Sequence, residues 1–210
     1  YNGVTVGSDA QTVLRAVAAQ NVAGIRDTLR LLRPQELFIL AEKMIAARRI
    51  VLSAGGRSLL PAKNLAARLS RIGISTQIAL EQQHMENPAN FLRKGDVLIL
   101  FSMWMQRESC AGLMRRAQAC GAYTAIFTAN LPRAEVFSPD IIVEFAPEPR
   151  TKAGHTNTTI TQTVVTDMLY ELVCERLGET ARCATRKTNA AMAAERAQCN
   201  EKQSFGAMIF

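Results

Sequence analysis

Five short segments of apolar and β-branched residues recur along the chain and alternate with longer stretches of helical periodicity. The predicted strands cover residues 50–52, 76–80, 97–101, 124–127 and 141–145. Two of these segments are almost continuously apolar, which is typical of strands covered by helices on both faces. Strands that alternate with helices pair in parallel through right-handed crossovers. The pattern therefore predicts an α/β fold built on a doubly wound, five-stranded parallel sheet.

The helical stretches have recognisable beginnings and ends. Pro34 suits a first helical turn, and Gly73 and Gly121 follow the ends of two apolar stripes, where glycine is common. The predicted helices cover residues 9–32, 34–47, 59–72, 109–120, 164–173 and 180–199. We expect a single domain, because no repeat or low-complexity linker interrupts the chain. Its expected parts are a helical lead-in packed on the core (residues 1–48), the core with its last helices (49–200) and a tail (201–210).

Length and composition narrow the class of protein without changing this fold. The chain has 210 residues, of which 48% are hydrophobic and 20% charged. A domain of this size buries about 70% of its unfolded surface, so it needs no metal or disulfide to hold a core. No apolar run approaches the roughly 18 residues of a membrane-spanning helix. The chain begins at Tyr1 and lacks the layout of a signal peptide. We therefore expect a cytoplasmic piece of a longer protein, with no membrane partner.

The formal net charge of +7 is spread along the chain instead of forming one basic stripe. Direct contact between this part of the protein and nucleic acid is therefore not expected. The five cysteines are an odd number without a C-x-x-C pair, and the two histidines are far apart in sequence. This pattern favours no metal site and no disulfide framework, and no cofactor is expected.

The turn after the first predicted strand is the first candidate for a ligand site, because ligands of parallel sheets bind beyond the carboxyl ends of the strands. Its two glycines allow close approach of a ligand to the backbone, and the helix that follows offers free N–H groups to an anion. The candidate residues are Ser53, Ala54, Gly55, Gly56, Arg57 and Ser58. The turn lacks the features of a dinucleotide site or a P-loop. An ordinary strand-to-helix turn capped by Ser58 is the alternative.

The turn after the third predicted strand is the second candidate, since it gathers hydroxyl, amide, guanidinium and carboxylate groups and the single tryptophan. The candidate residues are Ser102, Met103, Trp104, Gln106, Arg107 and Glu108. For Trp104 and the neighbouring methionines, packing against a helix or a second subunit is the alternative.

Two more segments are candidates to line the same cleft. Glu81 and His84 follow the second strand, and His155 and Thr156 lie in a threonine-rich segment before a helix. Neither histidine has neighbours that would make it a catalytic base. Exposed loop side chains and ordinary helix capping are the alternatives here.

These two turns and four longer stretches resemble a known family. The stretches are residues 21–32, 46–71, 95–108 and 166–188. The chain resembles a SIS (sugar isomerase) domain, and it is similar to the effector-binding half of bacterial transcription regulators of the RpiR (MurR/RpiR) family. The resemblance implies a flavodoxin-like three-layer sandwich with extra terminal helices. It also implies a homodimer or homotetramer that binds a small phosphorylated sugar, and DNA contact only through an amino-terminal helix-turn-helix domain that this chain does not contain.

The chain departs from the family pattern at the residues expected to hold phosphate. In the first turn the family's serine falls on Arg57, and Ser53 takes the place of its first glycine. In the second turn Ser102 and Glu108 match the family's first serine and its glutamate. The other positions, where the family has serine, glycine and threonine, are Trp104, Met105 and Arg107.

An arginine fork matches a planar carboxylate and also binds phosphate. We therefore expect Arg57, with Arg107 as a second contributor, to receive the anionic group of the ligand, while Trp104 walls the pocket. A surface role for Arg57 beside a degenerate site is the alternative.

Three functions follow from these features. The leading expectation is a sensor without catalytic residues, in which an anionic metabolite changes the arrangement of attached DNA-binding domains. A sugar-phosphate isomerase with Glu108 as base and a dimerisation module without ligand are the alternatives.

Overall fold

The computed structural model describes residues 9–80, 88–105, 108–147 and 159–206. Its centre is one sheet of five parallel strands in the order β2-β1-β3-β4-β5. The strands are β1 (Arg49–Ala54), β2 (Thr76–Leu80), β3 (Asp96–Phe101), β4 (Tyr123–Thr128) and β5 (Ile141–Glu144). The predicted sheet is confirmed, and each strand lies within two or three residues of its expected position.

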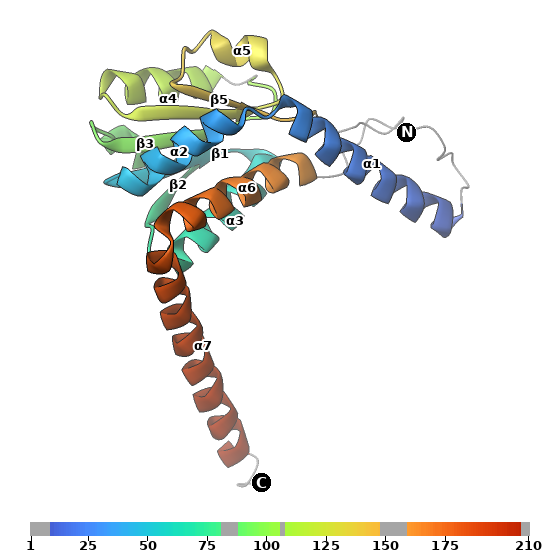
Figure 1. The fold of residues 1–210 in the computed structure, drawn as a ribbon, viewed down its shortest axis with the longest axis vertical. Coiled ribbons are helices and arrows are strands. Elements are labelled where there is room, and N and C mark those ends of the chain that lie inside the picture. Colours follow the sequence, from blue (N-terminus) through green and yellow to red (C-terminus); the bar gives the residue numbers. More distant parts are fainter. Residues whose placement is uncertain (1–8, 81–87, 106–107, 148–158, 207–210) are drawn as a thin grey trace.

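The helices form a layer on each face of the sheet (Figure 1). One face is covered by α2 (Pro34–Ala46), α3 (Leu59–Arg71) and α6 (Ile160–Leu177), and α1 (Ala10–Leu31) packs on α6. The other face is covered by α4 (Glu108–Ala119), α5 (Leu131–Glu135) and the short 3-10 helix η2 (Pro88–Phe91). The sequence pattern did not indicate α5, η2 or the 3-10 turn η1 (Gly56–Ser58), because such short elements carry too few residues to show a period.

Alternating residues of the strands supply two apolar cores. On the side of α2, α3 and α6, the rings of Phe101 and Phe127 lie 4.7 Å apart within the larger core. On the side of α4, Val51 and Leu100 belong to the smaller core, together with Met105. All six residues of β3 are buried, and the five that follow Asp96 are apolar, as in a strand covered by helices on both faces.

The carboxyl-terminal half of α1 is fixed to the core through Thr28, whose side chain is fully buried. Its hydroxyl donates to the carbonyl oxygen of Gly24 (2.8 Å) and accepts from the N–H of Ala146 (3.2 Å), just after β5. Gly24 lets α6 approach closely, because a Cβ atom added there would lie 3.1 Å from Cγ2 of Thr161.

The last helix, α7 (Glu179–Gly206), projects from the α/β core as a single arm (Figure 1). Its root is bonded to the end of α3: the Thr188 hydroxyl donates to the carbonyl oxygen of Arg71 (3.1 Å), and Arg71 Nη2 donates to Asn189 Oδ1 (2.8 Å). Residues 189–196 are all exposed. The helix runs beyond its expected end at Cys199, so residues 201–206, expected as part of a tail, are helical.

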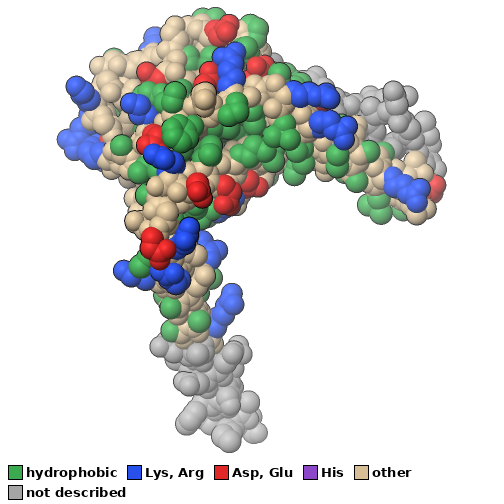
Figure 2. Space-filling model, in the orientation of Figure 1, with side chains coloured by type: hydrophobic (Ala, Val, Ile, Leu, Met, Phe, Trp, Pro, Cys, Tyr) green, Lys and Arg blue, Asp and Glu red, His purple; other side chains and the backbone are tan. Residues whose placement is uncertain are grey.

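Figure 2 shows hydrophobic side chains gathered across α2 and α6 and along α1, while charged side chains of both signs are scattered around them. The expectation that positive charge forms no single stripe therefore agrees with this face of the molecule. Within the described ranges, no helix has the length and apolar character needed to cross a membrane.

Candidate functional site

The first turn leaves β1 at the carboxyl edge of the sheet and enters α3 through η1. Gly56 adopts a φ of +54°, a left-handed conformation that favours glycine, and a Cβ atom added there would meet nothing within 4 Å. Ala54 is buried at the end of the strand, whereas Gly56 and Arg57 are exposed. The backbone around Gly56 is therefore open to close approach by a ligand.

Ser58, not Arg57, is the side chain of this turn that points inward. Ser58 is buried at the start of α3, and it makes no capping hydrogen bond through its side chain. The alternative in which Ser58 caps an ordinary turn is therefore not what the structure has. Arg57 lies on the surface.

Ser53 adds a buried polar group beneath the turn. It pairs in register with Ala79 and Leu100, and its side chain is fully buried. Within the described part of the chain, its hydroxyl oxygen has no hydrogen-bond partner. Burying a hydroxyl without a partner costs about 1–3 kcal/mol, so a hydrogen bond from a bound ligand to the Ser53 hydroxyl would be favourable.

The second turn, after β3, is held against the end of β4. The carbonyl oxygen of Met103 accepts from the Thr128 hydroxyl and from the N–H of Ala129, both at 3.0 Å, and that of Trp104 accepts from Asn130 Nδ2 at 3.3 Å. In a trans peptide the C=O and the following N–H point in opposite directions. The N–H groups of Trp104 and Met105 are therefore directed away from the end of β4.

Met105 has a φ of +49°, which is unusual for a residue with a side chain. Its side chain is fully buried in the smaller core with Cys110 and Leu113, so packing holds the backbone in this strained state. Cys110 Sγ lies 3.9 Å from the hydroxyl of Ser102, and Trp104 is half-buried. The family pattern has a glycine at the position of Met105. This is the one sequence signal that could have indicated the positive φ of Met105.

The two turns share a left-handed residue at the same distance from the helix that follows. Gly56 and Met105 are both left-handed, and each stands three residues before the first residue of a helix, α3 and α4 respectively. Because β1 and β3 are neighbours, with Ala54 opposite Phe101, the two turns leave the sheet side by side. The strand order reverses at this point, which is where ligands of doubly wound sheets bind. Left-handed turns before helix starts present backbone N–H groups suited to an anion.

Several candidate residues fall outside the described part of the chain. These are Glu81, His84, Gln106, Arg107, His155 and Thr156. Glu108 begins α4, but its side chain also lies outside the description. Their part in the site stays a prediction.

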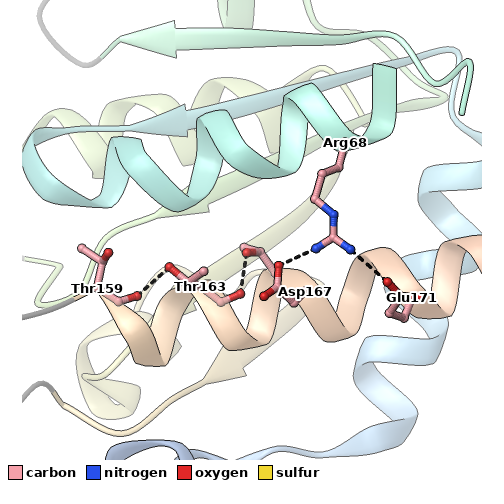
Figure 3. A network of polar contacts seen from close by, with 6 residues as sticks. Arg68, Thr159, Thr163, Asp167 and Glu171 are labelled. Atoms are coloured by element: carbon pink, nitrogen blue, oxygen red, sulfur yellow. Dashed lines mark hydrogen bonds and ion pairs between the residues drawn. The ribbon is translucent and has the colours of Figure 1, made fainter. Parts of the chain in front are cut away.

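A polar network, which the sequence pattern did not reveal, joins the last turn of α3 to α6 (Figure 3). Arg68 of α3 forms ion pairs with Asp167 and with Glu171 (2.9 Å) on α6, and its guanidinium lies 3.9 Å from the ring centre of Tyr170. The pKa of Tyr170 is raised to about 12, mainly by burial and to a smaller extent by a hydrogen bond with Cys174. The network fixes α3, which begins at the first turn, against α6.

A separate open cavity of about 500 Å³ lies at the opposite, amino-terminal edge of the sheet. Its lining includes Lys43, Gln118 and Tyr123, together with Asp96, whose Oδ2 pairs with Arg48 (2.6 Å). Burial and the charge of Asp140 raise the pKa of Tyr123. This cavity is remote from the two turns, because it sits where the strands begin.

Comparison with known proteins gives consistent matches. The family model described as "SIS domain" matches residues 43–172. An HTH-type transcriptional regulator of Caldanaerobacter subterraneus subsp. tengcongensis is 27% identical over 177 residues, covering 83% of this chain and 62% of the relative. The chain therefore spans less than two thirds of that regulator.

Two of the solved structures with the same fold are a transcription factor domain and a protein in complex with a phosphorylated sugar. The sugar isomerase domain of an RpiR transcription factor from Sphaerobacter thermophilus matches with a TM-score of 0.73 and 20% identity, covering 84% of this chain and 98% of that one. The NanR protein of Vibrio vulnificus complexed with ManNAc-6P matches with a TM-score of 0.75 and 19% identity, covering 87% of this chain and 69% of that one.

Proposed function

The chain belongs to the SIS domain family, and from this premise we propose that it is the effector-sensing domain of a cytoplasmic transcriptional regulator. In this proposal a small anionic metabolite, a sugar phosphate or a carboxylate-bearing derivative, binds at the carboxyl edge of the sheet. Binding shifts the arrangement of the subunits and so the DNA affinity of a helix-turn-helix domain outside this chain. The similarity to an HTH-type regulator over 83% of the chain supports this role.

One observation carries the proposal: the matched left-handed turns at Gly56 and Met105, side by side before α3 and α4. They can hold an anion through backbone N–H groups, so the loss of hydroxyl side chains at Trp104 and Arg107 does not remove the site. NanR, which shares the fold, is complexed with ManNAc-6P, and this makes a sugar phosphate the first ligand to test.

Arg57 is proposed to add a charge-assisted contact at the rim of the site. Its exposed position is compatible with a fork on the anionic group, whether phosphate or carboxylate. Such a contact at an exposed position contributes about 1 kcal/mol, which corresponds to about a fivefold change in affinity.

Calorimetric titration with ManNAc-6P, inorganic phosphate and unphosphorylated N-acetylmannosamine tests the proposal. We expect the phosphorylated sugar to bind, the free sugar not to bind, and Arg57→Ala to weaken binding about fivefold. Absence of binding by any anion in a wider panel of sugar phosphates and sugar acids would instead favour a dimerisation module without ligand. The same mixtures are assayed for aldose–ketose interconversion, because turnover would favour an isomerase.

A homodimer is proposed as the assembly. Large apolar side chains stand exposed on α1 and α2, among them Leu14 (70%), Val22 (55%) and Ile39 (44%). Leu14 and Val22 lie two helical turns apart on one side of α1, and an apolar stripe on a projecting helix favours packing against another helix. A second copy of the chain presents the same apolar stripe, so two copies related by two-fold symmetry can bury their stripes against each other.

A further inference from the structure

Buried polar atoms without a partner are concentrated near the proposed site. Within the described side chains there are four: Ser53 Oγ, Thr161 Oγ1, Gln162 Oε1 and Asp96 Oδ1. Asp96 lies at the amino-terminal edge of the sheet, whereas Ser53 is next to the end of β1 and the other two are in the first turn of α6. Burying an acceptor without a donor is unfavourable, so three such atoms near one edge call for a functional reason.

The first turn of α6 is level with the first turn of α3. Figure 3 shows α3 and α6 side by side and running in the same direction, joined where Arg68 meets Asp167 and Glu171. Since α3 starts directly after β1 at the carboxyl edge, α6 starts at that edge too. The side chain of Thr159 does not cap the start of α6, and the carbonyl oxygen of Thr159 accepts from the N–H and the hydroxyl of Thr163, both at 2.9 Å.

Gln162 and Thr161 face different neighbours. Gln162 lies on the stripe of α6 that continues through Val165, Leu169 and Val173, which belong to the core beneath the sheet. Thr161 is turned to α1, because its Cγ2 is the atom closest to a Cβ added at Gly24. Of the two, only Gln162 therefore lies on the face of α6 that is turned to the core beneath the sheet. Its side chain is 1% exposed.

We propose that Gln162 recognises the neutral, hydroxyl-bearing part of the effector, with its Oε1 accepting a hydrogen bond from a ligand hydroxyl. The inference rests on the proposed sugar-phosphate site. The backbone turns at Gly56 and Met105 hold the anionic group, and the first turn of α6 shifts to admit the sugar. Recognition of hydroxyl groups by an otherwise unpaired acceptor is selective, because a ligand without the hydroxyl leaves that acceptor unsatisfied.

The test compares Gln162→Met with a matched control, Thr166→Val, on the same buried stripe. Methionine keeps the volume of glutamine and removes the unpaired oxygen. The hydroxyl of Thr166 is already bonded to the carbonyl oxygen of Thr163 (2.8 Å), so its loss leaves the site unchanged. Affinities are measured by calorimetry for inorganic phosphate, ManNAc-6P, glucosamine 6-phosphate and ribose 5-phosphate.

We expect Gln162→Met to keep the affinity for inorganic phosphate and to lower the preference for the best sugar phosphate about five- to tenfold. Its thermal midpoint should match or exceed that of the wild type, which excludes misfolding as the cause. Thr166→Val should keep the wild-type preference. An unchanged preference in Gln162→Met overturns the inference and leaves the proposed function standing. If the wild type binds phosphate but prefers no sugar phosphate, the inference also fails, and if it binds no anion, the proposed function fails.

Discussion

A single hydroxyl, that of Thr28, connects α1 to the end of β5. It accepts a hydrogen bond from the N–H of Ala146, and both groups are buried. We expect Thr28→Val to lower the free energy of unfolding by about 1–3 kcal/mol, because it leaves this N–H without a partner. Urea denaturation followed by circular dichroism measures the loss.

Thr185→Val is the matched control, because the Thr185 hydroxyl donates only to the carbonyl oxygen of Ala181 within α7. Its expected loss is below about 0.5 kcal/mol. Equal losses in the two variants would mean that the bond to Ala146 has no special weight.

At Tyr170, burial raises the pKa to about 12 from an ordinary value of 10.0. The unfolded chain therefore loses this proton first as the pH rises. The contribution of the protonated Tyr170 to the free energy of unfolding is fully present below about pH 10 and is lost between about pH 10 and 12. We expect the free energy of unfolding to fall less over this range in Tyr170→Phe than in the wild type. Parallel curves for the two proteins would contradict the raised pKa.

The sequence predicted the first turn of the site but not the backbone conformation of the second turn or the buried side chain at the start of α3. The glycines at positions 55 and 56 pointed to the first turn, because glycine tolerates a positive φ and close approach. The residue type of Met105 carries no such signal: only the glycine that the family pattern has at this position indicates a positive φ, and packing in the core maintains it. Likewise, the inward side chain at the start of α3 is Ser58 and not Arg57, because the 3-10 turn η1 rotates the chain before the helix begins.

At the scale of elements, the period of apolar residues was sufficient to predict the sheet and the long helices. All five strands and their parallel pairing follow from continuous apolar runs such as β3, alternating with helical stripes. The contacts between α3 and α6 could not be predicted, because they join residues about 100 positions apart, such as Arg68 and Asp167. No local pattern records such a pairing.

We expect Arg68→Gln to lower the free energy of unfolding by about 1 kcal/mol, because it removes two ion pairs and the contact with the Tyr170 ring. Arg30→Gln removes the more exposed pair with Asp27 and should cost less than about 0.5 kcal/mol. Chemical denaturation of both variants tests the difference. A cost for Arg30→Gln equal to that for Arg68→Gln would contradict a special role of the network.

At the scale of the whole molecule, the proposed assembly depends on the exposed side of α1. We expect Val22→Asp combined with Leu29→Asp to convert a dimer into a monomer, since both side chains are more than half exposed and the charges would be buried in the interface. Light scattering coupled to gel filtration measures the mass. Arg115→Asp, at an exposed position of α4 on the other face of the sheet, is the control and should leave the mass unchanged. An unchanged mass in the double variant would place the interface elsewhere.

The bonds between Arg71 at the end of α3 and Thr188 and Asn189 in α7 have a geometric consequence. α3 begins at the proposed site and ends beside Thr188 and Asn189, beyond which α7 continues over residues 190–206, or about 26 Å. A rod of this length works as a lever: a tilt of about 5° at Asn189 moves its far end by about 2 Å. A small adjustment at the ligand turn would therefore become a displacement of about 2 Å at the end of α7.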